Sequence, residues 1–126
     1  MKPCLLVVDD EPLNRELLSR LLGRDYELEE AESVDAALAV VARRGTELGL
    51  IICDQMMPGR FGTDLAAEVR ASHPTVRVVL LTGYEDDATV LRARAEGLVA
   101  GIIAKPWKSS ELRALIRDLL LPRPPE

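Results

Sequence analysis

Short strand-like segments alternate five times with helix-like segments along the chain, and this rhythm restricts the fold more than any other feature. Four of the strand-like segments are continuous apolar runs, which is typical of strands buried on both faces of a parallel sheet. The sequence predicts strands over residues 4–8, 26–30, 49–53, 76–81 and 100–104. It predicts helices over residues 11–22, 33–44, 62–72, 86–96 and 109–120. Such alternation indicates crossover units on one parallel sheet.

The second strand differs from the others and sets the expected strand order. Its side chains alternate between polar and apolar, and it contains the acids Glu27, Glu29 and Glu30. This pattern is typical of a partly exposed edge. Five parallel strands with the second at an edge fit the doubly wound order 2-1-3-4-5, with right-handed crossovers placing helices on both faces. We therefore expect a flavodoxin-like (βα)5 sandwich of three layers, in the α/β class.

Length and composition indicate one domain. The chain has 126 residues, of which 48% are hydrophobic and 29% are charged, which suits a domain that buries its own core. We expect this domain to cover residues 1–121. Residues 122–126 read Pro-Arg-Pro-Pro-Glu, which cannot continue a helix and resembles the start of a proline-rich linker or tail. An effector domain in a longer parent chain is therefore expected.

Charge and hydropathy argue against several classes of partner. A formal net charge of −5 disfavours direct binding of nucleic acid, which relies on a concentrated basic face. No apolar stretch approaches the roughly 20 residues that a membrane span needs, and no signal-peptide pattern opens the sequence. We predict a cytoplasmic protein whose partners are proteins rather than membranes or nucleic acids. Cys4 and Cys53 fall inside apolar strands, so we expect buried, reduced thiols.

Polar side chains stand where the predicted strands end. They are Asp9 and Asp10 after the first strand, Asp54 after the third, Thr82 after the fourth and Lys105 after the fifth. Because the carboxyl ends of neighbouring parallel strands lie at one edge of a sheet, these side chains should share a pocket. Taken alone, Asp9 and Asp10 could simply cap the helix that follows them. The additional carboxylate of Asp54 favours an acidic pocket.

Three carboxylates in one pocket need a neutralising partner. Two like charges at about 4 Å repel by on the order of 4 kcal/mol at an effective dielectric constant of 20. Either protons are retained or a cation binds. Carboxylates without histidine or cysteine ligands suit a hard, octahedral ion. We therefore predict Mg²⁺ as the cofactor, bound by Asp9, Asp10 and Asp54.

A carboxylate beside Mg²⁺ can also attack phosphorus and form an aspartyl phosphate. Asp54 is the best candidate, because it stands alone at its strand end, whereas Asp9 and Asp10 are adjacent and suited to holding metal. Lys105 and Thr82 would supply an ammonium and a hydroxyl for the phosphoryl group. The simpler interpretations are a solvated loop lysine and a threonine cap. The common position of both residues at one edge makes these less attractive.

The chain resembles a response-regulator receiver domain of two-component signal transduction, with a fold like that of the chemotaxis regulator. The resemblance rests on four motifs in order and spacing: Val7-Val8-Asp9-Asp10-Glu11, Asp54-Gln55-Met56-Met57-Pro58, Leu81-Thr82-Gly83 and Lys105-Pro106-Trp107. It implies a phosphorelay function in which a sensor histidine kinase or phosphotransfer protein phosphorylates Asp54. Such a domain is not an enzyme beyond catalysing its own phosphorylation and dephosphorylation.

The resemblance also implies roles for individual residues. Asp10 would bind Mg²⁺ directly, and Asp9 would act nearby or through water. The backbone carbonyl of Met56 would complete the protein's metal ligands. Thr82 would be the switch hydroxyl, and Lys105 the phosphate-binding ammonium.

Two departures from the usual receiver pattern affect the expected switching. Receivers of this type usually carry tyrosine or phenylalanine three residues before the lysine, where this chain has Ile102. We expect Ile102 to weaken coupling between the phosphoryl group and the surface over residues 86–120. Met56 and Tyr84 stand beside the phosphoacceptor and the switch threonine, where bulky side chains could shield an acyl phosphate from water. Slow self-dephosphorylation is therefore expected.

Two surfaces are candidates for protein partners. The first helix contains five leucines that spread over roughly half of its circumference, wider than the roughly 100° stripe that one buried face needs: Leu13, Leu17, Leu18, Leu21 and Leu22. A kinase four-helix bundle could dock on exposed leucines there, unless neighbouring loops cover them. The face over residues 86–120 combines an apolar edge strand with mixed charge, which suits a homodimer or effector docking.

Three other functions fit parts of the pattern. A Mg²⁺-dependent phosphohydrolase of the haloacid dehalogenase type would need an Asp-x-Asp motif after its first strand, where this chain has adjacent aspartates. A flavodoxin-like cofactor binder would need a phosphate loop rich in serine, threonine and glycine, and Asp9-Asp10-Glu11 would repel the cofactor phosphate. A receiver that serves only as a binding module is the third, and the full acidic, threonine and lysine set argues against it.

Overall fold

Five strands and five α-helices alternate along residues 2–120, the part of the chain that the computed structural model describes. The strands are β1 (Cys4–Val8), β2 (Glu27–Ala31), β3 (Leu48–Asp54), β4 (Arg77–Thr82) and β5 (Gly101–Ala104). The helices are α1 (Pro12–Leu22), α2 (Val34–Arg44), α3 (Gly62–Ser72), α4 (Ala88–Ala95) and α5 (Ser109–Leu120). All neighbouring strands are parallel, in the order β2-β1-β3-β4-β5. The predicted doubly wound fold is confirmed.

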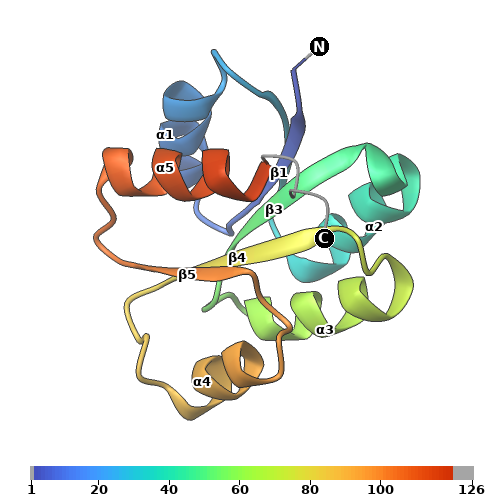
Figure 1. Cartoon of the computed structure of the whole chain (residues 1–126), viewed down its shortest axis with the longest axis vertical. Coiled ribbons are helices and arrows are strands. Elements are labelled where there is room, and N and C mark those ends of the chain that lie inside the picture. Colours follow the sequence, from blue (N-terminus) through green and yellow to red (C-terminus); the bar gives the residue numbers. More distant parts are fainter. Residues whose placement is uncertain (1, 121–126) are drawn as a thin grey trace, which may run out of the picture.

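Helices cover both faces of the sheet, as right-handed crossovers require. On one face α1 and α5 lie side by side (Figure 1), and Arg113 of α5 donates a hydrogen bond of 2.9 Å to the carbonyl of Leu21 in α1. On the other face α2, α3 and α4 pack over the sheet. The carboxyl ends of all five strands therefore lie at one edge, between the two helical layers.

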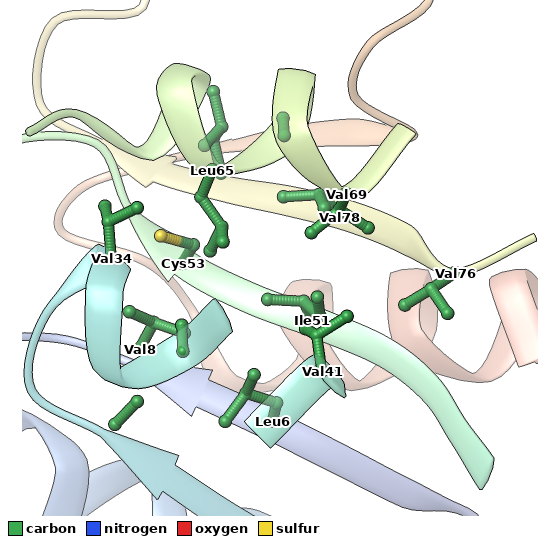
Figure 2. Packing of buried hydrophobic residues seen from close by; sticks show 14 of the residues in the cluster. Leu6, Val8, Val34, Val41, Ile51, Cys53, Leu65, Val69, Val76 and Val78 are labelled. Carbon is green, nitrogen blue, oxygen red and sulfur yellow. The ribbon is translucent and has the colours of Figure 1, made fainter. Parts of the chain in front are cut away.

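Alternating strand side chains build one core under each helical layer. Figure 2 shows the core under α2 and α3, in which strand residues such as Leu6, Ile51 and Cys53 meet Val41, Leu65 and Val69 of the helices. The core on the other face is closed by Leu18 and Leu22 of α1 and by Leu112 and Ile116 of α5. Each fully buried leucine or isoleucine contributes roughly 2 kcal/mol to folding. Cys4 and Cys53 are buried free thiols, as predicted, and burial raises the pKa of both.

Several element boundaries differ from the predicted ones by one or two residues. Asp54 and Thr82 are the last residues of β3 and β4 rather than the residues after them. Helix α4 begins at Ala88, not at residue 86, because the side chain of Asp87 caps it. The Asp87 Oδ1 accepts hydrogen bonds from the N–H groups of Thr89 and Val90, at 2.9 and 3.4 Å. Such a cap satisfies helix donors that have no partner within the helix.

Gly49 lets the end of α5 approach the start of the sheet. The register between β1 and β3 shifts there, since Cys4 pairs with Leu48 while Leu5 pairs with Leu50. Gly49 is thus the extra residue of a β-bulge, and Leu48 and Leu50 contribute to opposite cores. A Cβ at Gly49 would lie 2.9 Å from Leu120 Cδ2. Glycine therefore permits this contact between β3 and the last turn of α5.

The two edge strands of the sheet differ in the charge of their side chains. On β2, the carboxylate of Glu29 accepts a hydrogen bond of 3.0 Å from Arg43 and lies 3.4 Å from the guanidinium of Arg44. The hydrogen bond from Arg43 lowers the pKa of Glu29. These charged pairs on β2 confirm the predicted polar edge and disfavour pairing with another strand. The strand β5 at the opposite edge carries only glycine, isoleucine and alanine.

Among residues 2–120, no helix is long and apolar enough to cross a membrane. The linker expected over residues 122–126 lies outside the described residues.

Candidate functional site

The predicted site residues come from the carboxyl ends of four strands. Asp9 and Asp10 follow β1, and Lys105 follows β5. Asp54 ends β3, directly after Cys53, which pairs with Val8 at the end of β1. Thr82 ends β4 and pairs with Ala104, the residue before Lys105. The sheet order thus makes neighbours of residues that are up to 96 positions apart, counted from Asp9 to Lys105.

The three carboxylates form one acidic cluster. One oxygen from each of Asp9, Asp10 and Asp54 lies within 4.8 Å of the other two. Asp9 and Asp54 are buried, whereas Asp10 is partly exposed. This donor set of carboxylate oxygens, with no histidine or cysteine, fits a hard ion such as Mg²⁺.

Burial is the largest influence on the pKa of Asp54. It raises the pKa of this carboxyl, because the ionised form loses its hydration. The Lys105 ammonium opposes the effect, and the negative charges of Asp9 and Asp10 add to it. The net shift of the pKa is upward, so the surroundings of Asp54 disfavour its ionised form. A bound cation would remove this penalty.

Lys105 makes the one ion pair inside the cluster among the described residues. Its Nζ lies 2.5 Å from Oδ1 of Asp54. The Lys105 backbone N–H also donates a hydrogen bond of 2.9 Å to the carbonyl of Thr82. A main-chain bond to the neighbouring strand end therefore helps to hold the ammonium over the carboxylate, and Lys105 is not a free loop charge.

Thr82 is buried, and its hydroxyl is engaged by the loop that follows. The Oγ1 accepts a hydrogen bond of 2.9 Å from the backbone N–H of Tyr84. Residues 83–89, between Thr82 and the first turn of α4, are all exposed, so the loop can adjust without opening the core.

Asp9 has a second set of contacts that matches the simpler helix-cap interpretation in part. Its Oδ1 accepts a hydrogen bond of 2.9 Å from the N–H of Glu11, just before α1. Its carbonyl accepts one of 2.7 Å from Arg15. These bonds orient the carboxylate at the end of β1 while it remains a member of the acidic cluster, so the two interpretations are compatible.

A cavity of about 470 Å³ opens beside the cluster, between α1 and the segment after β5. Its lining includes Asp9, Leu17, Lys105 and Trp107. The side chains of Met56, two residues after Asp54, and of Tyr84, two residues after Thr82, are exposed by 51% and 66%. Apolar side chains of α1 and of the segment after β5 therefore line the cavity next to Asp9 and Lys105.

Comparison with known proteins identifies the family. Residues 5–117 match the response regulator receiver domain. The chain belongs to this family. Members are regulatory phosphoacceptor domains of two-component systems, and the match argues against a dehalogenase-type phosphohydrolase or a flavodoxin-like cofactor binder.

Curated relatives carry this receiver domain within longer chains. It is 32% identical over 114 residues to the hydrogenase transcriptional regulatory protein HoxA of Cupriavidus necator, an alignment that covers 90% of this chain and 23% of HoxA. It is 35% identical over 127 residues to the transcriptional regulatory protein AruR of Pseudomonas aeruginosa, covering 95% of this chain and 50% of AruR. The chain thus spans at most half the length of these two relatives.

A solved receiver structure has the same architecture. The response regulator protein TrrA from Thermotoga maritima, crystallised in complex with Mg²⁺-BeF, superposes with a TM-score of 0.80 at 32% identity. The alignment covers 95% of this chain and 100% of TrrA. The receiver fold expected from the motifs is therefore confirmed.

In this receiver domain the residue three positions before Lys105 is aliphatic. Ile102 of β5 is partly buried and packs against the core under α2, α3 and α4. It pairs with Leu80 of β4, two residues before Thr82. An isoleucine in that place has no ring or hydroxyl that could swing between core and solvent.

Sequence reasoning missed two polar residues of this receiver domain. Gln55 and Thr63 are both buried, and they bond each other through their side chains. A polar residue directly after a buried strand, and a threonine at the start of the next helix, were the available signals. Neither residue alone indicates a site. The hydrogen bond between them depends on how the loop over residues 56–61 brings its two ends together.

Proposed function

We propose that Asp54 is the phosphoacceptor of this receiver domain and that Mg²⁺ binds at Asp9, Asp10, Asp54 and the backbone carbonyl of Met56. Lys105 and Thr82 would bind the phosphoryl group. The observation that carries the proposal is the cluster of three carboxylates within 4.8 Å, with Lys105 paired to Asp54. The domain then catalyses only its own phosphorylation and dephosphorylation.

The chemistry follows from the surroundings of Asp54. When bound, Mg²⁺ would neutralise charge on the transferring phosphoryl group and orient it. A carboxylate oxygen of Asp54 forms the new bond to phosphorus while the bond from phosphorus to the donor's histidine nitrogen breaks, and the nitrogen keeps that electron pair. Partial burial leaves the carboxylate poorly hydrated and so more reactive. The Lys105 ammonium favours the ionised carboxylate and would also contact the phosphoryl oxygens.

Thr82 provides the switching step. Its hydroxyl would turn from the N–H of Tyr84 to a phosphoryl oxygen, since a charged acceptor forms a stronger hydrogen bond than the present one. The loop before α4 then loses its anchor, and the surface over residues 86–120 shifts. Local charge thereby biases a two-state element.

The lifetime of the phosphoryl group should depend on Met56 and Tyr84. Met56 is two residues from Asp54 and Tyr84 two residues from Thr82, and both bulky side chains are exposed, so they would exclude attacking water. We expect Met56→Asn combined with Tyr84→Ala to hasten phosphate loss by about tenfold, which corresponds to roughly 1.4 kcal/mol of barrier. Phosphate release after removal of the donor measures this rate. An equal or slower loss in the double variant would reject the shielding role.

The partners belong to the same proposal. A sensor histidine kinase or phosphotransfer protein would dock on α1, where Leu13 and Leu17 are exposed by 76% and 54%. The face over residues 86–120 would support a homodimer or an effector domain, to which residues 122–126 would lead as a linker. The net charge of −5 supports protein rather than nucleic acid partners, in the cytoplasm.

Acetyl phosphate provides a direct test without a kinase. Incubation with acetyl phosphate and Mg²⁺ should add the mass of one phosphoryl group to the intact protein. The gain should disappear in Asp54→Asn and when a chelator removes Mg²⁺. A stable protein that gains no mass would be a receiver used only as a binding module, and an undiminished gain in Asp54→Asn would place the acceptor elsewhere.

A further inference from the structure

Gln55 is a buried polar residue immediately beside Asp54. Its side chain is only 3% exposed. The Oε1 accepts a hydrogen bond of 2.9 Å from the backbone N–H of Thr63, and the Nε2 lies 3.3 Å from the Thr63 hydroxyl oxygen, to which it donates. Both ends of the amide are thus used by one residue at the start of α3.

The main chain of Gln55 is held from two further directions. Its N–H donates a hydrogen bond of 3.0 Å to the carbonyl of Leu81 in β4. Its carbonyl accepts one of 3.0 Å from the N–H of Gly62. Residue 62 has no room for a side chain, since a Cβ there would lie 2.7 Å from the carbonyl oxygen of Asp54. The end of β3 and the start of α3 are therefore held together by hydrogen bonds and close packing.

These contacts close the loop over residues 56–61 at its base. Gln55 stands at the start of the loop, and Gly62 and Thr63 stand at its end. Three hydrogen bonds join these two ends, and the fourth, from the Gln55 N–H to Leu81, ties the start of the loop to β4. The first residue inside the closed loop is Met56, next to Asp54 and Gln55 in sequence. A further contact holds the end of the loop at the start of α3, because the N–H of Phe61 donates to Asp64 Oδ2 at 2.7 Å.

Packing alone does not require this arrangement. An apolar side chain of similar length would fill the space of Gln55. A buried amide, by contrast, loses its hydration and is stable only when its oxygen and nitrogen are both hydrogen-bonded. Polar groups of this kind serve to fix one geometry when they are fully bonded. Groups that orient metal ligands without touching the metal commonly change metal affinity by 10- to 100-fold when removed.

We infer that Gln55 is a positioning residue that sets the Mg²⁺ affinity of the site by fixing the Met56 carbonyl relative to the Asp54 carboxylate. The inference rests on the proposed function, which assigns both groups to the metal. Gln55 acts through the closed loop and contributes no ligand of its own. Thr63 is its partner on α3.

Mg²⁺ titration by calorimetry tests the inference. Gln55→Met keeps the length of the side chain and removes both side-chain hydrogen bonds to Thr63, so we expect Mg²⁺ to bind about tenfold more weakly. Gln55→Glu keeps an acceptor for the Thr63 N–H, so its affinity for Mg²⁺ should stay within threefold of that of the parent. At saturating Mg²⁺, the rate of phosphorylation of Gln55→Met by acetyl phosphate should return to near that of the parent.

A matched control separates positioning from general loss of stability. Arg77 is the first residue of β4 and lies away from the carboxyl ends of the strands. Its side chain donates a hydrogen bond of 2.8 Å to the carbonyl of Leu119. Arg77→Met should lower thermal stability and leave Mg²⁺ affinity unchanged. Should Gln55→Met fail to fold, Thr63→Val removes one of the two side-chain bonds and should weaken Mg²⁺ binding by about threefold, a part of the effect of the full loss.

The outcomes distinguish this inference from the proposed function. If the parent binds Mg²⁺ and Asp54→Asn weakens it, while Gln55→Met and Thr63→Val bind as the parent does, the inference is overturned and the proposed function stands. If the parent binds no Mg²⁺, both are overturned. Equal losses of affinity in Gln55→Met and Arg77→Met would also reject a specific positioning role.

Discussion

At the scale of single residues, Asp54 is the group on which folding and function make opposite demands. Burial raises its pKa, the charges of Asp9 and Asp10 raise it further, and Lys105 only partly compensates. A carboxyl whose pKa is raised by folding stabilises the protein fully below its unfolded value, near 3.8. That stabilisation is lost as the pH rises through the folded pKa. At neutral pH the ionised acceptor therefore costs stability in the absence of metal.

Replacing Asp54 should therefore stabilise the protein when no metal is bound. We expect Asp54→Asn to have a higher melting temperature than the parent at pH 7 in a chelator, because it carries no buried charge. The difference should shrink or vanish near pH 3.8, where the parent carboxyl is protonated. Thermal unfolding at both pH values measures this. A lower melting temperature for Asp54→Asn at pH 7 would show that the Lys105 pair outweighs burial.

At the scale of elements, the sequence predicted which segments form strands and helices because local patterns determine them. Apolar runs and turn residues mark β1, β3, β4 and β5, and acids mark the edge strand β2. The close approach of Leu120 to Gly49 at the bulge could not be predicted, since the two residues are more than 70 positions apart. The Gln55 and Thr63 pair could not be predicted for a different reason. It depends on how a loop closes, which no local pattern records.

Helix α1 illustrates an element with separate structural and interaction faces. Leu18 and Leu22 are buried in the core, whereas Leu13 and Leu17 face solvent. The predicted excess of leucine over one buried stripe is confirmed, because neighbouring loops leave these two exposed. The exposed pair contributes little to folding and is available to a partner.

Substitutions on the two faces of α1 should therefore have different consequences. Leu13→Ala with Leu17→Ala should change the free energy of unfolding by less than about 1 kcal/mol, as is usual for surface positions. Leu18→Ala should cost about 2–5 kcal/mol. The double variant should still accept phosphate from acetyl phosphate but more slowly from a cognate kinase. Denaturant unfolding and the two phosphorylation rates measure this; an unchanged kinase rate would remove α1 from the docking surface.

At the scale of the whole molecule, the parallel sheet brings distant residues to one edge, and this is what made the site predictable. Strand order alone makes neighbours of the ends of β1, β3, β4 and β5. The sequence could therefore indicate the acidic cluster and the lysine without coordinates. It could not show that the Thr82 hydroxyl accepts a hydrogen bond from the Tyr84 N–H, because the rotamer of Thr82 depends on how the chain turns after β4. That bond links Thr82 to the loop before α4 through the main chain of Tyr84.

Communication from the site to the surface over residues 86–120 should be weak in this chain. Ile102 packs against the core under α2, α3 and α4 and has no ring that could turn toward solvent, so we expect the path through β5 to transmit little. We expect amide chemical shifts on α4, β5 and α5 to change less on addition of beryllofluoride and Mg²⁺ than in an Ile102→Tyr variant. Equal changes in both proteins would show that coupling does not need the aromatic side chain.

The Mg²⁺ dependence of phosphorylation at Asp54 tests the central claim most directly, namely that carboxylates from separate strands form one metal site around a phosphoacceptor. The initial rate with acetyl phosphate should rise with Mg²⁺ and saturate in the parent. In Asp10→Asn, which leaves the acceptor intact, saturation should require at least tenfold more Mg²⁺, in line with the loss of about 1.4 kcal/mol of binding. A rate that is the same in chelator and in saturating Mg²⁺, or an identical Mg²⁺ dependence in Asp10→Asn, would contradict the account.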